Sequence, residues 1–279
     1  MFSIIIPTYN NLDYLKLTIA SIKKFTKVRY EILIHVNEGN DGTLQYVKKN
    51  KFIYTHSKQN LGLCSSINLI TKKAKYNYYL YSHDDMFFCP NWDKAAVIEI
   101  NKIKHNKFYI SGTMIEPNSG HIKFNAGYDI KTFNKKKLIN NLSKLKFYDH
   151  QGTHFAPHIV HKSMWNRVGG FSEEFNPGFG SDPDFNMKLW KKGVRIFKGI
   201  NNFRVYHFGS ITTRKNKMIT KNRGDKTFLK KWGITVKFFK KHYLKSGSIY
   251  KGPLNDPHKN INYFLELLIS KIKLLFLFV

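Results

Sequence analysis

Residues 76–85 read YNYYLYSHDD, an aromatic and apolar run that ends abruptly in an imidazole and two carboxylates. The run has the length and composition of a buried β-strand. Charged groups are costly to bury unless they are paired or bind a metal. His83, Asp84 and Asp85 therefore form either a solvated turn between two elements or a place where a cation binds.

The sequence on the N-terminal side of this stretch alternates between strand-like and helix-like segments. Apolar runs predict strands at residues 2–6, 30–36, 51–56 and 76–82, and apolar spacing predicts helices at residues 12–22 and 60–74, with Asn10 or Asn11 capping the first helix. Such alternation is typical of βαβ units and a parallel sheet. Ligands of parallel sheets bind beyond the carboxyl ends of the strands, where residues 7–11, 37–43 and 83–85 form polar loops. This position favours a cation site over a surface turn.

The sequence after residue 90 is less regular. It predicts a strand at residues 107–117, a basic helix or flexible insert at 135–146, a strand and a short helix within 154–171, a helix at 180–193, and two short strands, VRIFKG (194–199) and FRVYHFGS (203–210).

Charge is the unusual part of the composition. The 279 residues carry a formal net charge of +29, which attracts polyanions such as nucleic acid, anionic membranes or phosphorylated ligands. A genome biased in base composition would also enrich Lys, Asn, Ile, Tyr and Phe without selection for function. The two cysteines, Cys64 and Cys89, have no metal-ligand spacing and are too few for a disulfide framework, so we expect a reducing, cytoplasmic compartment.

Residues 261–279, INYFLELLISKIKLLFLFV, predict a C-terminal helix that follows a strongly basic region. Its polar residues Asn262, Glu266, Ser270 and Lys273 share one helical face. This pattern fits a helix that lies in a membrane interface better than one that spans the bilayer, and would place the protein at the cytoplasmic face of a membrane. The alternative is a helix that packs on the protein's own core.

The order of the motifs resembles that of the family-2 glycosyltransferases. The resemblance rests on SIIIPTYNN (3–11), NLGLCSSIN (60–68), the acidic strand end at 83–85, GGFSEEFNPGFGSDPDFNMKLWKKG (169–193) and VYHFGS (205–210). It implies the α/β class and the GT-A fold, a Rossmann-like α/β/α sandwich with a mostly parallel central sheet. We expect a GT-A domain at residues 1–212, with a nucleotide-binding half at 1–90 and an acceptor half at 91–212. A basic helical extension follows at 213–279.

The resemblance implies an inverting, metal-dependent glycosyltransferase of the hexosyltransferase type. Such an enzyme moves a sugar from a nucleotide-diphosphate donor, a UDP-sugar in preference to others, to a glycan, lipid-linked or protein acceptor. A divalent cation, Mn²⁺ in preference to Mg²⁺, neutralises the leaving diphosphate. Where the family has an Asp-x-Asp-like motif this chain has His83-Asp84-Asp85, and the implied metal ligands are Asp85, His207 and His83.

The remaining site residues come from the same resemblance. Asp182 matches the general base and Asp184 is a second acid, while Ser181 replaces the glutamate that usually precedes the base. The alternative is that Ser181 and Asp182 only cap and charge a helix. The residues expected to contact the donor are Pro7, Thr8, Tyr9, Asn37, Glu38, Asn60, Gly62, Asp84, Arg214 and Lys215, and those in acceptor-facing regions are Glu116, His154, His158, Trp165 and Trp190.

Two other classes of function remain open at this point. The charge suits a basic nucleic-acid-binding protein, but the sequence has no zinc spacing, RNP-like strand or helix-turn-helix pattern, so nucleic acid is not the expected partner. A membrane-associated, catalytically inactive relative is the other alternative, with His83 and Ser181 as signs of decay.

Overall fold

The computed structural model describes residues 1–209 and 224–277 of the chain. The strands are β1 (Phe2–Tyr9), β2 (Tyr30–Asn37), β3 (Ile53–Ser57), β4 (Tyr78–Tyr81), β5 (Met86–Phe88), β6 (Phe108–Glu116), β7 (Ile122–Lys123), β8 (His150–Gln151), β9 (His158–His161) and β10 (Ile196–His207). The helices are α1 (Leu12–Phe25), α2 (Thr43–Lys49), α3 (Leu63–Thr71), α4 (Trp92–Lys102), α5 (Lys135–Asn141), α6 (Lys162–Val168), α7 (Ser181–Lys191), α9 (Gly224–Trp232), α10 (Val236–Phe238) and α11 (Ile261–Leu275), with a 3₁₀ turn η1 (Glu173–Phe175) and a π-helical segment η2 (Phe239–Leu244).

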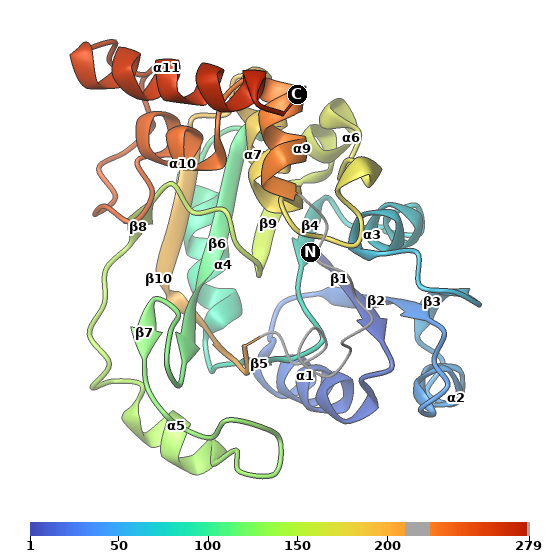
Figure 1. Cartoon of the computed structure of the whole chain (residues 1–279). Coiled ribbons are helices and arrows are strands. Elements are labelled where there is room, and N and C mark those ends of the chain that lie inside the picture. Colours follow the sequence, from blue (N-terminus) through green and yellow to red (C-terminus); the bar gives the residue numbers. More distant parts are fainter. Residues whose placement is uncertain (210–223, 278–279) are drawn as a thin grey trace.

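One sheet forms the centre of the molecule, with helices packed around it (Figure 1). Its strand order is β3-β2-β1-β4-β9-β6-β10-β5, with β7 on β6 and β8 on β10. β1 pairs in parallel with both β2 and β4, and β2 pairs in parallel with β3, as the alternating pattern predicts. Because the chain leaves β1 in one direction and returns on its other side at β4, the carboxyl ends of β1 and β4 flank a topological switch point.

The second half of the sheet is mixed. β9 is antiparallel to β4 and β6, whereas β10 is parallel to β6 and antiparallel to β5. The prediction of two short strands at residues 194–199 and 203–210 was wrong, because both runs belong to β10. Both pair with β6, on either side of a register shift between Ile200 and Arg204. Helix α4 had no counterpart among the predicted elements.

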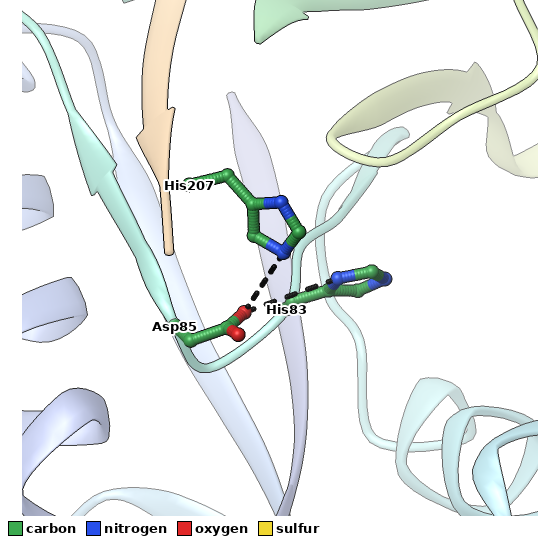
Figure 2. Close-up of side chains that lie close together, drawn as sticks. All are labelled: His83, Asp85 and His207. Atoms are coloured by element: carbon green, nitrogen blue, oxygen red, sulfur yellow. Dashed lines mark ion pairs between the residues drawn. The ribbon is translucent and has the colours of Figure 1, made fainter. Parts of the chain in front are cut away.

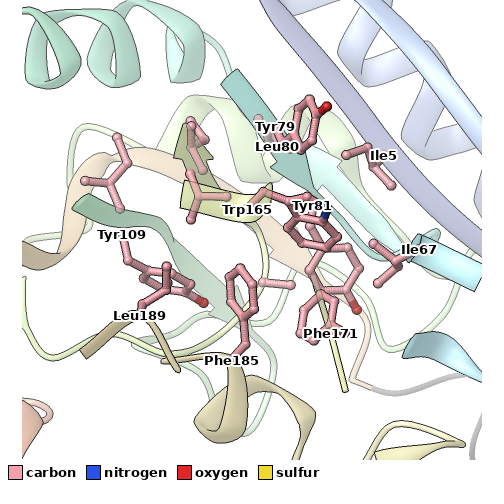
Figure 3. Close-up of a cluster of buried hydrophobic side chains, with 14 of the residues drawn as sticks. Ile5, Ile67, Tyr79, Leu80, Tyr81, Tyr109, Trp165, Phe171, Phe185 and Leu189 are labelled. Carbon is pink, nitrogen blue, oxygen red and sulfur yellow. The ribbon is translucent and has the colours of Figure 1, made fainter. Parts of the chain in front are cut away.

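Aromatic side chains fill the core between the sheet and α6 and α7 (Figure 3). The ring of Trp165 lies 5.2 Å from that of Phe185 and 6.0 Å from that of Tyr79, centroid to centroid. Trp165 and Trp190 are both buried, so they are core residues rather than a surface on which a sugar stacks. This packing fixes α7, whose first turn reaches the functional site.

The C-terminal region is helical, as expected, and folds back onto the rest of the chain. Figure 1 shows α11 lying across α9 and α10. The segment between η2 and α11 is attached by backbone hydrogen bonds, including Leu254 N–H to the carbonyl of Arg195 at 2.8 Å. Within residues 1–209 and 224–277, no helix combines the length and the apolar character that crossing a bilayer requires.

Candidate active site

A cavity of about 460 Å³ opens beyond the carboxyl ends of β1, β2 and β4. Of the residues predicted from the sequence, it brings together Pro7, Thr8, Tyr9, Asn37, Asn60, Gly62, His83, Asp84, Asp85, His154 and Asp182. Glu38, Asp184 and His207 are not among its lining residues, and Arg214 and Lys215 lie outside the described residues. Segments that are far apart in the sequence therefore meet at the edge of the sheet where the strand pattern predicted ligand binding.

Three side chains of this region lie close enough to share one cation. The candidate ligand atoms of His83, Asp85 and His207 all lie within 4.8 Å of one another (Figure 2). His207 Nε2 is 3.3 Å from Asp85 Oδ1, and His83 Nδ1 is 4.0 Å from the same oxygen. The antiparallel pairing of β10 with β5 aligns His207 with Met86, which places the imidazole beside Asp85.

Glu116 fixes the orientation of the His207 ring. Its Oε1 lies 2.5 Å from His207 Nδ1, so the proton on Nδ1 is donated to the carboxylate and Nε2 faces Asp85. A histidine whose other nitrogen is held by a carboxylate is a common arrangement for a metal ligand. An imidazole, a carboxylate and a second imidazole thus fit a divalent cation of borderline softness.

Two carboxylates, Asp85 and Glu116, flank the buried His207 ring. Burial would lower the pKa of His207, but Asp85 and Glu116 raise it to about 10. Burial lowers the pKa of His83 to about 4, which leaves that imidazole neutral.

Asp84 joins the two strand-end loops. Its Oδ2 accepts a hydrogen bond from Thr8 Oγ at 2.6 Å and its Oδ1 accepts one from Asn11 Nδ2 at 3.1 Å. Burial and the neighbouring Asp85 raise the pKa of Asp84 to about 7. Asn11 is the N-cap residue of α1, as one of the two predicted candidates, but its side chain makes no cap hydrogen bond. The amide is used instead to hold Asp84 in place.

Asn37 and Gly62 shape the wall formed by residues 57–66. Asn37 is buried, and its Oδ1 accepts a hydrogen bond from Leu61 N–H at 2.9 Å. Gly62 has φ +79°, and a Cβ there would lie 2.5 Å from the Asn176 side chain. Only glycine combines this backbone angle with such close contact. Asn60 accepts a hydrogen bond from Gly62 N–H at 2.9 Å and so closes the turn.

Asp182 stands in the first turn of α7 and lines the same cavity. Burial raises its pKa to about 7, and among the described residues its buried Oδ1 atom has no hydrogen-bond partner. The helix cap is Gly180, with φ +84°, and no side chain caps α7. The alternative in which Ser181 and Asp182 serve only as caps is therefore not supported by the hydrogen bonds.

Asp184 lies away from the cavity and joins α7 to α9. Its carboxylate accepts hydrogen bonds from Trp232 Nε1 at 2.8 Å and Ser172 Oγ at 2.6 Å, and it forms an ion pair with Lys231 at 2.9 Å. It is fully buried. These contacts connect the first turn of α7, which carries Asp182, to Ser172 and to α9.

Sequence reasoning missed the part that Glu116 plays beside His207, and it did not include Phe155 among the lining residues. Glu116 is the last residue of the buried strand β6, and Asp85 follows the buried strand β4. A carboxylate at the end of a buried strand indicated Asp85, and the same signal could have indicated Glu116. Phe155 stands in an irregular segment after β8, where no periodic pattern marks it.

Comparison with known proteins agrees with this geometry. The sequence profile described as glycosyl transferase family 2 matches residues 3–169. The chain belongs to this family. An uncharacterized glycosyltransferase of Rickettsia typhi is 28% identical over 203 residues, which cover 70% of this chain and 59% of that protein. The hyaluronan synthase of Pasteurella multocida is 26% identical over 245 residues, covering 85% of this chain and 22% of the synthase. The chain thus spans about three fifths or less of the length of these relatives.

Solved structures of glycosyltransferases share the fold. S. aureus TarS (residues 1–349) in complex with UDP-GlcNAc matches with a TM-score of 0.54 and 19% identity, covering 75% of this chain and 60% of that one. GalNAc-T7 with UDP, GalNAc and Mn²⁺ matches with a TM-score of 0.58 and 16% identity, covering 82% of this chain and 47% of that one. The fold of this family-2 chain is therefore GT-A, with additional helices at its C-terminal end.

Proposed function

We propose that this family-2 chain transfers a hexose from a nucleotide-diphosphate donor to a hydroxyl of a glycan or lipid-linked acceptor, with inversion at the anomeric carbon. The observation that carries the proposal is that one cavity is lined both by the candidate metal ligands and by a buried carboxylate from α7. Asp85, with His83 and His207 beside it, and Asp182, whose buried Oδ1 has no hydrogen-bond partner among the described residues, belong to this one region. A base and a diphosphate site on opposite sides of a sugar are what a single displacement requires.

The donor's diphosphate is assigned to the wall formed by residues 83–85. Asp85, His207 and His83 would hold a divalent cation, and Mn²⁺ is favoured over Mg²⁺ because two of the three ligands are nitrogen atoms. When bound, such a cation offsets the negative charge of the departing diphosphate. GalNAc-T7 was solved with Mn²⁺ and UDP, which is consistent with this choice.

The transfer step is assigned to Asp182. The acceptor oxygen attacks the anomeric carbon from the face opposite the diphosphate, and the carbon–oxygen bond to the diphosphate breaks as the new bond forms. The hydroxyl proton passes to the Asp182 carboxylate. A pKa of about 7 suits this role, because the group is largely ionised just above neutral pH and is still basic enough to accept the proton.

The nucleotide is assigned to the loops after β1 and β2. Tyr9 and Glu38 are placed at the base and ribose, since Glu38 interacts with the Tyr9 hydroxyl and accepts from Asn10 Nδ2 at 3.1 Å. A UDP-sugar is the favoured donor, and the TarS complex with UDP-GlcNAc supports that choice. Contacts of Arg214 and Lys215 with the diphosphate, the boundary at residues 212/213 and a cytoplasmic location stay predictions.

Release of nucleoside diphosphate tests the proposal. Purified protein is incubated with UDP-, GDP- and dTDP-hexoses, with Mn²⁺ or with EDTA, and Asp85→Asn and Asp182→Asn are compared with wild type. The matched control is Asp13→Asn, an exposed carboxylate on α1. We expect release from one donor class that needs the metal, is retained in the control and falls at least about 100-fold in both site variants. Binding of a donor without any release would indicate the inactive alternative, and absence of donor binding would refute the proposal.

A further inference from the structure

Helix α11 is attached to the protein by a narrow strip. Tyr263 and Ser270 are buried, and Thr235 N–H lies 3.4 Å from Ser270 Oγ. Glu266, on the same side, forms ion pairs with Lys241 and with His242, the latter at 2.8 Å. The helix therefore uses much of its polar side to contact α10 and η2, and leaves the rest of its surface to the outside.

The outward side of α11 is apolar. It presents Ile261, Phe264, Leu265, Leu268, Ile269, Ile272, Leu275 and Phe276, each 42–78% exposed. At about 100° per residue, these eight side chains fall within an arc of about 140° that contains no polar residue. Lys271 borders this arc on one side and Lys273 on the other, and both are exposed. Monomeric proteins rarely leave such a continuous apolar surface uncovered.

A basic groove lies beside the apolar surface. Its volume is about 1150 Å³, and it lies between α11 and the α9–α10–η2 region, with Ile269 and Phe276 on the α11 side. The lysines that line it are Lys226, Lys237, Lys240, Lys241, Lys245 and Lys273. Apolar side chains next to a concentration of positive charge are complementary to a surface that has both an apolar interior and anionic groups.

Charge decides between the candidate occupants. A second copy of this chain would bring together two surfaces that each carry Lys271 and Lys273, in a protein of net charge +29, and like charges repel. A nucleic acid would neutralise the lysines but would leave eight large apolar side chains in water. An anionic lipid surface accommodates both the lysines and the apolar side chains. The apolar arc enters the acyl region while the bordering lysines contact the headgroups.

We propose that α11 lies flat in the interface of an anionic lipid bilayer and holds the protein at the membrane surface. The 15-residue helix is too short to cross the bilayer, and the groove beside it receives anionic headgroups. α11 contacts α9, and Trp232 of α9 donates to Asp184 of α7. The membrane contact is therefore linked through one helix to the element that carries Asp182, which would keep the orientation of the cavity relative to the bilayer constant.

Vesicle sedimentation tests this inference without any activity measurement. The full chain is mixed with vesicles of phosphatidylcholine alone or with phosphatidylglycerol added, at low and high salt. Two α11 variants are compared with wild type, Phe264→Ser/Leu268→Ser for the apolar arc and Lys271→Gln/Lys273→Gln for its borders. Matched controls are Ile98→Ser, an exposed apolar residue on α4, and Lys48→Gln/Lys49→Gln on α2. Circular dichroism verifies that each variant is folded.

We expect binding to the anionic vesicles that weakens with salt. The double apolar variant should bind about tenfold more weakly or worse, and each lysine replaced should reduce affinity about fivefold. The α4 and α2 controls should bind as wild type. The inference is refuted if wild type does not sediment with anionic vesicles or if the double apolar variant binds unchanged. It is also refuted if wild type is a dimer that the Phe264→Ser/Leu268→Ser change converts to monomer without any effect on lipid binding.

Discussion

Replacing Asp182 with asparagine should abolish sugar transfer and at the same time stabilise the folded protein at alkaline pH. The carboxyl has a pKa of about 7 because it is desolvated, against 3.8 for an ordinary aspartate. An acid whose pKa is higher in the folded protein favours folding most at low pH, and that contribution is lost as the pH rises from 3.8 through about 7. Above this range the folded protein carries a poorly solvated charge.

The size of the expected stability change follows from the shift in the pKa of Asp182. One pKa unit corresponds to about 1.4 kcal/mol, so the full penalty is at most about 4 kcal/mol at pH 8. The asparagine amide removes the charge but brings its own polar atoms into the site, and we expect a net gain of about 2–4 kcal/mol. For a chain of this size this raises the melting temperature by about 5–10 °C at pH 8, and by about half as much at pH 5.5.

Two assays compare Asp182→Asn with wild type. Thermal melts of unliganded protein at pH 5.5 and pH 8 measure stability, with Asp13→Asn as the exposed control. Donor turnover measures activity, and in wild type kcat/KM should rise with pH through about 7 as Asp182 ionises. A variant with unchanged melting temperature at both pH values would show that the carboxyl is not desolvated. A variant that retains wild-type transfer would remove Asp182 from the mechanism.

Three further changes test the supporting structure. Glu116→Gln removes the charge that fixes the His207 ring, and we expect Mn²⁺ affinity, measured by titration calorimetry in the presence of donor, to fall about 10–100-fold; unchanged affinity would contradict this positioning role. Gly62→Ala forces a Cβ against Asn176 at positive φ, and should destabilise the protein by about 1–3 kcal/mol and weaken donor binding, as measured by denaturant unfolding and equilibrium dialysis. Phe185→Ala opens a cavity at a fully buried core position and should cost about 3–5 kcal/mol in denaturant unfolding, and a loss below 1 kcal/mol would contradict its place in the core.

The parallel half of the fold could be predicted because its strands carry their own signals. The apolar runs at residues 2–6, 30–36 and 76–82 correspond to β1, β2 and β4, each within three residues at either end. Their polar ends met at one cavity because parallel strands that flank a switch point deliver their loops to one edge. Local composition was therefore sufficient to predict the strands of the parallel half.

The antiparallel half was harder to predict because its pairing depends on distant residues. The bulge in β10 left two apolar runs that resemble separate strands, although both pair with β6. The distance between His207 and Asp85 depends on the register of β10 with β5, which no local pattern contains. The family resemblance supplied His207, whereas its partner Glu116 emerged only when β6 and β10 were placed side by side.

A crystal structure of the protein with Mn²⁺ and its UDP-hexose, with anomalous scattering recorded at the manganese edge, tests the central claim most directly. We predict an anomalous peak bonded to Asp85 and His207, the diphosphate against that peak, and the Asp182 carboxylate on the opposite face of the sugar ring. A manganese peak away from these two residues, or a donor whose anomeric carbon has Asp182 on the same side as the diphosphate, would contradict the account.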